Sequence, residues 1–113
     1  MNRIKKILLT SLSFISFCSS ADDYIYPEQA FLFYGQNKTV CGKVVQAVAR
    51  KGYFFVNYGD RYPNQTFHLF ITRPKNYNNL NKLLNKKVCA YGRIEMYKNK
   101  PQITDPIRIN LVK

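Results

Sequence analysis

Alternating apolar and polar residues mark most of this 113-residue chain, and the alternation predicts strands rather than long helices. The expected strands cover residues 39–49, both arms of the hairpin sequence GYFFVNYGDRYPNQTFHLFI from Gly52 to Ile71, and residues 87–97 and 101–109. Turns are expected at RKG (50–52), in the GDRYPNQ loop and at KNK (98–100), where the pattern is interrupted. The chain is therefore expected to be mainly β.

Two short segments have a helical pattern instead. YPEQAFLFYG has Pro27 at a tolerated first-turn position and Gly35 as a terminator, which predicts a helix of two or three turns. NYNNLNKLLNKK has Leu80, Leu83 and Leu84 at helical spacing. This second segment predicts a short helix packed through its leucines.

The hairpin is unusual because both of its alternating faces are apolar or aromatic. In its first arm Phe54, Val56 and Tyr58 share one face, whereas Tyr53 and Phe55 lie with Asn57 on the other. An antiparallel hairpin needs only one apolar face to pack on a core. The second face is either a surface for stacking a ligand or further core, covered by the N-terminal helix or by a partner subunit.

The first 21 residues have the features of a secretory signal peptide. Arg3, Lys5 and Lys6 form a positive start, ILLTSLSFISF is apolar but short for a membrane span, and SSA supplies small residues for cleavage. Cleavage after Ala21, or one or two residues away, would leave a chain exported to the periplasm or secreted from a bacterium, without a stable membrane anchor.

A lipoprotein signal that uses Cys18 is the alternative, although Phe17 stands where the lipoprotein peptidase requires a small residue. A retained membrane anchor is the remaining alternative. The expected organisation is a signal peptide over residues 1–21, an N-terminal helix with its lead-in over 22–38, and one small domain over 39–113.

The chain is strongly basic, with 18 lysine and arginine residues against six aspartate and glutamate residues. Loss of the signal peptide would lower the formal charge from +12 to +9, since three basic residues leave with it. Such a large positive charge favours a polyanionic partner, such as nucleic acid, lipopolysaccharide, acidic phospholipid or acidic glycan. Charge spread evenly over the surface for solubility is the alternative.

Cysteine usage also fits export. Only Cys41 and Cys89 would remain after cleavage, and two cysteines in an exported chain often form a disulfide. In TVCGKVV and KVCAYGRIE each cysteine lies on the face opposite its apolar neighbours, so both sulfurs would point the same way if the strands are adjacent. Two free, half-buried thiols are the alternative. Two separate cysteines and the single histidine lack the spacing of metal ligands, so no metal site and no cofactor are expected.

The order strand, strand, strand, helix, strand, strand is that of an OB-fold, a five-stranded Greek-key barrel. TVCGKVV, YFFVNYGDRYPNQTFHLFI and LLNKKVCAYGRIEMYKNKPQI together resemble small bacterial OB-fold modules of the nucleic-acid-binding type, and the preceding PEQAFLFYGQ helix belongs to the resemblance. Asn99 stands where that family often has glycine, and asparagine tolerates the left-handed backbone. The resemblance implies an all-β barrel preceded by a short helix. It specifies the ligand poorly, because OB barrels also bind oligosaccharides and proteins.

In an OB-fold the ligand lies across the outer surface of the second and third strands, between two loops. Aromatic rings between cationic rims would suit a single nucleic-acid strand, whose bases stack and whose phosphates are anionic. The expected nucleic-acid-binding residues are Arg50, Lys51, Tyr53, Phe55, Arg61, Tyr62, His68, Phe70, Arg73, Arg93, Tyr97, Lys98 and Lys100.

A catalytic role is not expected. Nucleases on a barrel of this kind need clustered carboxylates and paired arginines, whereas the ARKGY turn contains no acid and Asp60, Glu95 and Asp105 are scattered. Two functions remain. One is an exported module that binds single-stranded or exposed nucleic acid non-specifically. The other is a periplasmic envelope or stress protein whose barrel binds anionic glycan, lipid or a protein partner. The sequence leaves the oligomeric state open.

Overall fold

The computed structural model describes residues 23–73 and 80–112. Its strands are β1 (Asn37–Arg50), β2 (Tyr53–Tyr58), β3 (Phe67–Ile71), β4 (Lys87–Tyr97), β5 (Lys100–Thr104) and β6 (Arg108–Leu111). Two 3₁₀ helices accompany them, η2 (Pro27–Phe33) and η4 (Leu80–Leu83). The expected signal segment and Cys18 lie outside the described residues. No helix within the described ranges has the length and apolar character needed to cross a membrane.

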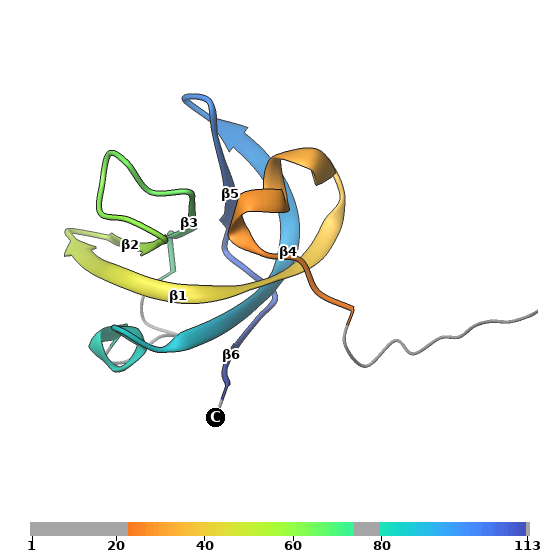
Figure 1. Cartoon of the computed structure of the whole chain (residues 1–113). Coiled ribbons are helices and arrows are strands. Elements are labelled where there is room, and N and C mark those ends of the chain that lie inside the picture. The colour runs from red at the N-terminus through yellow and green to blue at the C-terminus, as the bar shows by residue number, and fades with distance from the viewer. Residues whose placement is uncertain (1–22, 74–79, 113) are drawn as a thin grey trace, which may run out of the picture.

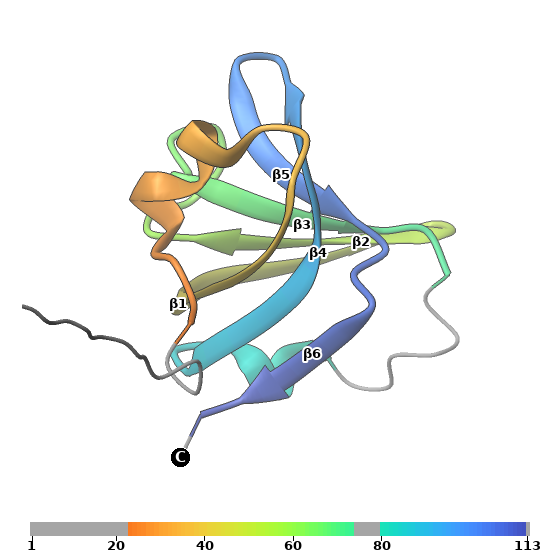
Figure 2. The same ribbon diagram turned by 90° about the vertical axis from the view of Figure 1, so that its right-hand side faces the viewer.

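Five of the strands close into a barrel (Figures 1 and 2). β1 pairs antiparallel with both β2 and β4, β2 pairs antiparallel with β3, and β4 pairs antiparallel with β5. The ring is completed by β3 and β5, which run parallel. This is the five-stranded Greek-key barrel of an OB-fold, preceded by a short helix, so the fold expected from the sequence is confirmed.

β1 belongs to both halves of the barrel. Its first half, from Asn37 to Lys43, pairs with β4, and its second half, from Val44 to Arg50, pairs with β2. The register shifts between Val44 and Gln46, where an irregularity lets the long strand bend from one partner to the other. In Figure 1 this strand sweeps across the whole molecule.

The barrel core takes side chains from each of the five strands. Val40, Val56, Leu69, Ile94 and Ile103 are all fully buried. Val56 lies on the face of β2 that the alternation assigned to the interior, and Tyr58 on the same face is also fully buried, with its hydroxyl donating to the backbone oxygen of Val88. Phe54, at the barrel edge, is half-buried and packs against this core.

Both helices are 3₁₀ rather than α. In η2 Pro27 and Ala30 are buried, and a Cβ at Gly42 would lie 2.5 Å from the Pro27 ring, so the close approach of η2 to β1 requires glycine there. In η4 Leu80 and Leu83 are buried, whereas Leu84 is exposed. The prediction that Leu84 packs with the other two was wrong, because the three-residue period of a 3₁₀ helix aligns only Leu80 with Leu83.

The prediction of a single last strand over residues 101–109 was also wrong. β5 ends at Thr104, and β6 starts at Arg108 and pairs farther along β4, with Val88–Tyr91. Asp105 has a φ of +47°, and its carboxylate accepts hydrogen bonds from the backbone and the hydroxyl of Thr72. Pro106 follows and has no N–H to continue the ladder. The chain therefore turns at Asp105, which lies in the bend and not in a strand.

Cys41 and Cys89 lie directly opposite each other where β1 pairs with β4. Their sulfurs form a disulfide with an S–S distance of 2.00 Å. β1 and β4 are thus joined covalently. The two sulfurs point the same way because Cys41 and Cys89 are register partners. The alternative of two free thiols is not what the structure shows.

Candidate ligand groove

A groove of about 590 Å³ runs along the outer surface of β2 and β3. One wall is the β2–β3 loop and the other is the β4–β5 turn, and both project to the same side of the barrel in Figure 1. The residues that line it are Gln46, Val48, Arg50, Phe55, Asn57, Tyr62, Pro63, Gln65, His68, Tyr97, Lys98 and Lys100. No described residue before Gln46 lines the groove, so η2 does not cover it.

Four rings form a contiguous aromatic layer on this surface. Phe55 stacks on Phe70 with ring centroids 5.1 Å apart and planes 28° apart. Tyr53 meets both phenylalanines edge-on at 5.5 Å, and His68 meets Phe55 at 5.7 Å. The tyrosine and both phenylalanines are only half-buried. The second apolar face of the hairpin is therefore an outer aromatic surface whose members support one another and remain partly accessible.

Cationic side chains stand on both sides of the groove. Arg50 ends β1, and Lys98 and Lys100 belong to the β4–β5 turn. In that turn Lys98 and Asn99 have φ values of +50° and +66°, the left-handed conformation that a two-residue hairpin turn requires. Lys98 places its Nζ 5.4 Å from the ring centre of Tyr97. None of the lining residues is acidic, so the groove is locally positive.

Polar side chains beside the rings form two chains of hydrogen bonds. In the first, Gln46 Oε1 accepts from the Tyr62 backbone N–H at 2.9 Å and from Asn57 Nδ2 at 2.8 Å. The backbone of the β2–β3 loop is thereby hydrogen-bonded to a side chain of β1. Asn57 is buried by this arrangement although it lies on the outer face of β2.

The second chain runs through the only histidine. Thr104 donates its hydroxyl to Glu95 at 3.0 Å and accepts from Gln102 Nε2 at 3.1 Å. Gln102 Oε1 then lies 2.6 Å from His68 Nε2, and His68 Nδ1 lies 3.2 Å from Gln65 Nε2. Since Gln102 presents an oxygen and Gln65 an NH₂, the imidazole carries its proton on Nε2 and accepts at Nδ1.

His68 is held in the neutral form. Burial lowers the pKa of its imidazole, the hydrogen bond to Gln102 opposes that effect, and the charge of Lys100 lowers the pKa further. A second proton on Nδ1 would also face the NH₂ of Gln65. The environment of His68 is that of a fixed hydrogen-bonding residue. Among the described residues no group of three His, Cys, Asp or Glu side chains is placed to hold a metal ion.

The residues expected from the sequence fall into three sets in the structure. Seven line the groove, namely Arg50, Phe55, Tyr62, His68, Tyr97, Lys98 and Lys100. Tyr53 and Phe70 adjoin it through the aromatic layer. Lys51, Arg61, Arg73 and Arg93 are exposed but do not line it.

Sequence reasoning missed five lining residues, which are Gln46, Val48, Asn57, Pro63 and Gln65. Gln46 and Val48 alternate with Arg50 along β1, and Asn57 shares its parity with Phe55, so a stricter use of alternation finds these three. Pro63 and Gln65 depend on the path of the β2–β3 loop, which no periodic pattern predicts.

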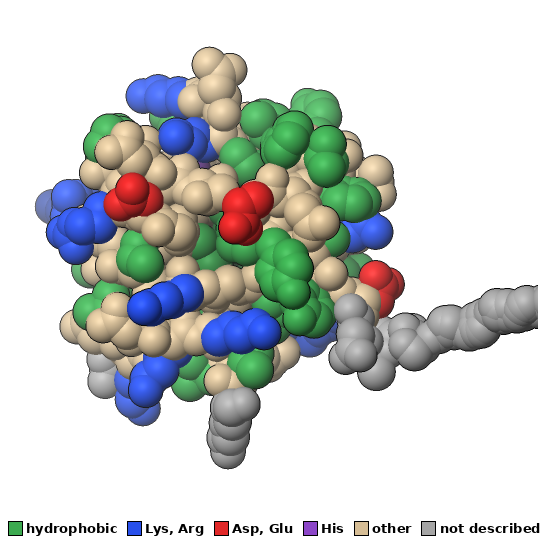
Figure 3. Space-filling view, in the orientation of Figure 1, with side chains coloured by type: hydrophobic (Ala, Val, Ile, Leu, Met, Phe, Trp, Pro, Cys, Tyr) green, Lys and Arg blue, Asp and Glu red, His purple; other side chains and the backbone are tan. Residues whose placement is uncertain are grey.

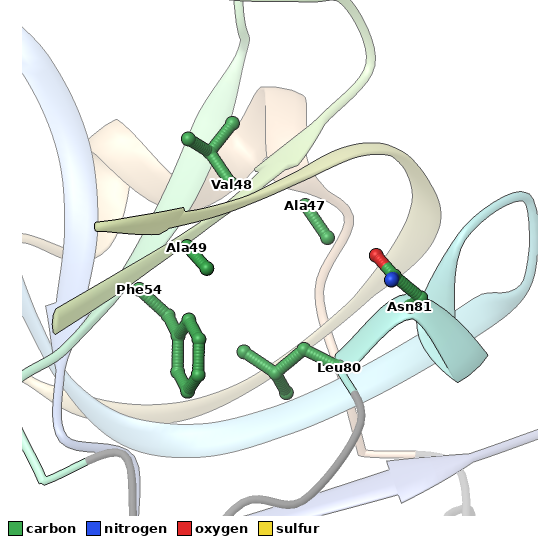
Figure 4. Close-up of a pocket in the computed structure, with 6 residues that line it drawn as sticks. All are labelled: Ala47, Val48, Ala49, Phe54, Leu80 and Asn81. Atoms are coloured by element: carbon green, nitrogen blue, oxygen red, sulfur yellow. The ribbon is translucent and has the colours of Figure 1, made fainter. Parts of the chain in front are cut away.

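A second, smaller hollow of about 200 Å³ lies on the other side of β1, beside η4 (Figure 4). Figure 4 shows Leu80 pointing toward the ring of Phe54, with the small side chains Ala47 and Ala49 above them. These alanines have the opposite parity to Gln46 and Arg50. The second half of β1 thus presents Gln46 and Arg50 to the groove and Ala47 and Ala49 to this hollow, while Val48 lines both.

An exposed apolar patch lies on η2 and the residues beside it. Tyr26, Phe31, Leu32 and Tyr34 are each more than half exposed, with values from 53% to 66%. Figure 3 shows apolar side chains gathered over this part of the molecule. Lys38 holds its Nζ 4.8 Å from the ring centre of Phe33. Apolar surface of this kind is typical of contact sites.

No protein-family model and no curated protein matches the sequence. Solved structures do match the fold. An OBody bound to hen egg-white lysozyme superposes with a TM-score of 0.60 at 17% identity, covering 84% of this chain and 98% of the other. The hypothetical protein ygiW from E. coli gives a TM-score of 0.52 at 16% identity, covering 88% and 100%. The chain is an OB-fold barrel.

Asparaginyl-tRNA synthetase from Pyrococcus horikoshii gives a TM-score of 0.57 at 10% identity. The match covers 80% of this chain but only 23% of the synthetase, so the likeness concerns one part of that enzyme. Each of these identities is low enough that the likeness describes the fold alone. The similar structures include proteins of different activities on the same barrel.

Proposed function

We propose that this chain is a non-catalytic binding module that holds single-stranded nucleic acid in the groove. The observation that carries the proposal is the aromatic layer of Tyr53, Phe55, Phe70 and His68, lying between cations and free of acidic lining residues. Stacked bases need exposed rings, and their phosphates need nearby positive charge. Electrostatic attraction serves any sequence, so binding is largely non-specific.

The neighbouring structures and the disulfide support this proposal in part. One of the similar structures is a tRNA synthetase, and another is a barrel bound to a protein, so partner binding is an established use of this fold. The Cys41–Cys89 bond suits an oxidising compartment, which supports export to the periplasm or beyond. Exposed or extracellular nucleic acid is then the form that the groove would meet.

Binding of single-stranded DNA, RNA, duplex DNA and heparin at two salt concentrations tests the proposal. The chain has nine tyrosines and no tryptophan, and Tyr53, Tyr62 and Tyr97 lie at the groove, so part of the tyrosine emission reports on it. Single strands should quench this emission and bind more tightly than duplex, whereas heparin should bind without quenching. Equal affinity for heparin and single strands, with no quenching by either, would refute the proposal.

The exposed patch on η2 favours a second candidate function, which is contact with an anionic envelope surface. Phe31 and Leu32 are exposed, and the chain carries a large positive charge. Co-sedimentation with vesicles of anionic and of neutral lipid tests this candidate. A Phe31→Ser/Leu32→Ser variant should lose vesicle binding while keeping nucleic-acid binding, because neither residue lines the groove.

A further inference from the structure

A basic surface outside the groove, the β4 face, lies on the outer side of the strands β1, β4 and β6. β4 pairs with the first half of β1 along one edge and with β6 along the other, and Figure 2 shows β6 beside it. Inward positions of β1 and β4 are fully buried, so the alternate positions point outward. The exposed cations of the β4 face are Lys43, Lys87, Arg93 and Arg108, and none of them lines the groove.

Two of these cations oppose each other directly. Lys43 of β1 and Lys87 of β4 are register partners, two residues from the Cys41–Cys89 bond that joins the same strands. Like charges at directly opposed positions are destabilising, and the disulfide keeps the two strands paired beside them. An anion that binds both ammonium groups would relieve this repulsion. The lysine pair therefore costs stability in the free chain and attracts anions.

Aromatic rings hold two of the cations in place. The Arg108 guanidinium lies 4.3 Å from the ring centre of Tyr91, which is its register partner on β4. Lys87 Nζ lies 5.4 Å from the ring centre of Tyr24, which precedes η2. A ring orients a cation without neutralising it, so both side chains keep their full charge for a ligand.

The three strands place no acidic side chain on the β4 face. Besides the cations, the outward positions of β1 before its register shift, of β4 up to Arg93 and of β6 hold only asparagine, threonine, cysteine and tyrosine. Asp23 and Glu28 belong to the segment before β1. Lys87 and Arg93 are six residues apart on β4, so at about 3.3 Å per residue the cations follow a line of about 20 Å. Such a line fits a linear polyanion.

We propose that the β4 face binds the phosphate backbone of a second nucleic-acid segment, so that one chain joins two segments. This proposal rests on the proposed function, because the groove holds the first segment. The rings of the β4 face support cations instead of stacking bases, so this face binds single strands and duplex alike. A strand long enough to reach both surfaces binds more tightly than two separate short strands.

Sedimentation of the chain with a single strand of about ten nucleotides, within the site size of one OB-fold, tests the proposal. Two strands should bind per chain at about 50 mM salt, and the strand on the β4 face should be lost first as salt is raised, because it depends on phosphate contacts alone. One strand per chain overturns this inference and leaves the groove as the site. Failure of any strand to bind overturns the proposed function and this inference together.

Two variants locate the second strand. Lys43→Ala/Lys87→Ala should weaken its binding on the order of 10-fold or more at about 50 mM salt, since two fewer counterions are released. Arg108→Gln, on another strand of the same face, should act in the same direction. The matched control is Lys51→Ala/Lys82→Ala, which removes two exposed charges that lie outside both surfaces and should leave two strands bound.

The midpoint of urea unfolding shows whether each variant is folded. Lys43→Ala/Lys87→Ala should leave this midpoint unchanged or raise it, because the substitution removes a like-charge repulsion. An unchanged second site in this folded variant overturns the inference, as does an equal loss in the control, which would mean that the second strand follows total charge. Binding of anionic-lipid vesicles that requires the lysine pair, with one strand per chain, would make the β4 face a lipid site instead.

Discussion

Phe55 and Phe70 stack on each other from directly opposite positions on β2 and β3. Each is the register partner of the other, so the pleat that buries Val56 and Leu69 places both rings on the outer surface. The pair forms a platform next to the cations of the groove. Because both rings lie on the outer surface, a substitution of either should weaken base stacking without unfolding the barrel.

Phe55→Ala should weaken single-strand binding by about 1–3 kcal/mol, the contribution of one base stacked on an aromatic ring. The dependence of affinity on salt should hardly change, because no phosphate contact is lost, and duplex binding should be little affected. Titrations at several salt concentrations measure both quantities. Val56→Ala, on the buried face, is the control for folding and should instead lower the free energy of unfolding by about 2–3 kcal/mol. Unfolding of both Phe55→Ala and Tyr53→Ala, without a separate effect on binding, would mean that the aromatic layer acts only as core.

Lys98→Ala and Lys100→Ala should weaken binding to all nucleic-acid sequences to a similar extent. Each substitution should also lower the slope of log affinity against log salt by about 0.7 for single strands, since one fewer counterion is released. Lys82→Ala is the matched control, because Lys82 is exposed on η4 and does not line the groove. If Lys82→Ala lowers the slope as much as Lys98→Ala, binding depends on total charge and the groove is not the site.

Stability should fall at mildly acidic pH because of His68. Its pKa is lowered in the folded protein, so the unfolded chain, with a histidine pKa of about 6.5, takes up the proton more readily. The free energy of unfolding is therefore unaffected by His68 well above pH 6.5, falls as the pH drops below that value, and levels off below the folded pKa. Urea unfolding across this range measures the slope. His68 is the only histidine in the chain, so His68→Gln should flatten the dependence of unfolding free energy on pH. An unchanged slope in that variant would mean that another group causes the pH dependence.

Loss of the disulfide should destabilise the barrel. The Cys41→Ala/Cys89→Ala variant should lose about 2–4 kcal/mol in free energy of unfolding, because the bond closes a loop across a sequence separation of 48 residues. Labelling of the denatured, unreduced protein should find neither Cys41 nor Cys89 reactive. Two reactive thiols from these positions, in protein prepared without reductant, would contradict the bond.

The barrel could be predicted because its information is local. Strand alternation and the RKG and KNK turns each depend on a few neighbouring residues. They give the order strand, strand, strand, helix, strand, strand, which is that of an OB-fold. The break at Asp105 was missed because it depends on a distant partner, the backbone N–H and hydroxyl of Thr72, which follows β3. A Thr-Asp-Pro sequence read alone shows only a weak interruption.

The candidate groove could likewise be predicted from the sequence only in part. Its rings and lysines follow from strand parity and turn position, which the sequence contains. Its polar lining residues do not, because Gln65 enters the groove only through the path of the β2–β3 loop, and Asn57 meets Gln46 across strands. Four exposed cations, Lys51 among them, were expected at the site but do not line the groove. A positive charge in the sequence indicates attraction to anions, but it does not show whether the side chain points into the groove.

The shift of register between Val44 and Gln46 sets which face every later residue of β1 occupies. Deletion of one residue there would exchange the two sides of the strand, turning Gln46 and Arg50 inward and placing Ala47 and Ala49 in the groove. The composition of the chain would barely change, yet the groove would lose Arg50 and the hydrogen bond between Gln46 and the backbone of Tyr62. In a lineage of such proteins, insertions and deletions should therefore accumulate in the loops and be excluded from this stretch of β1.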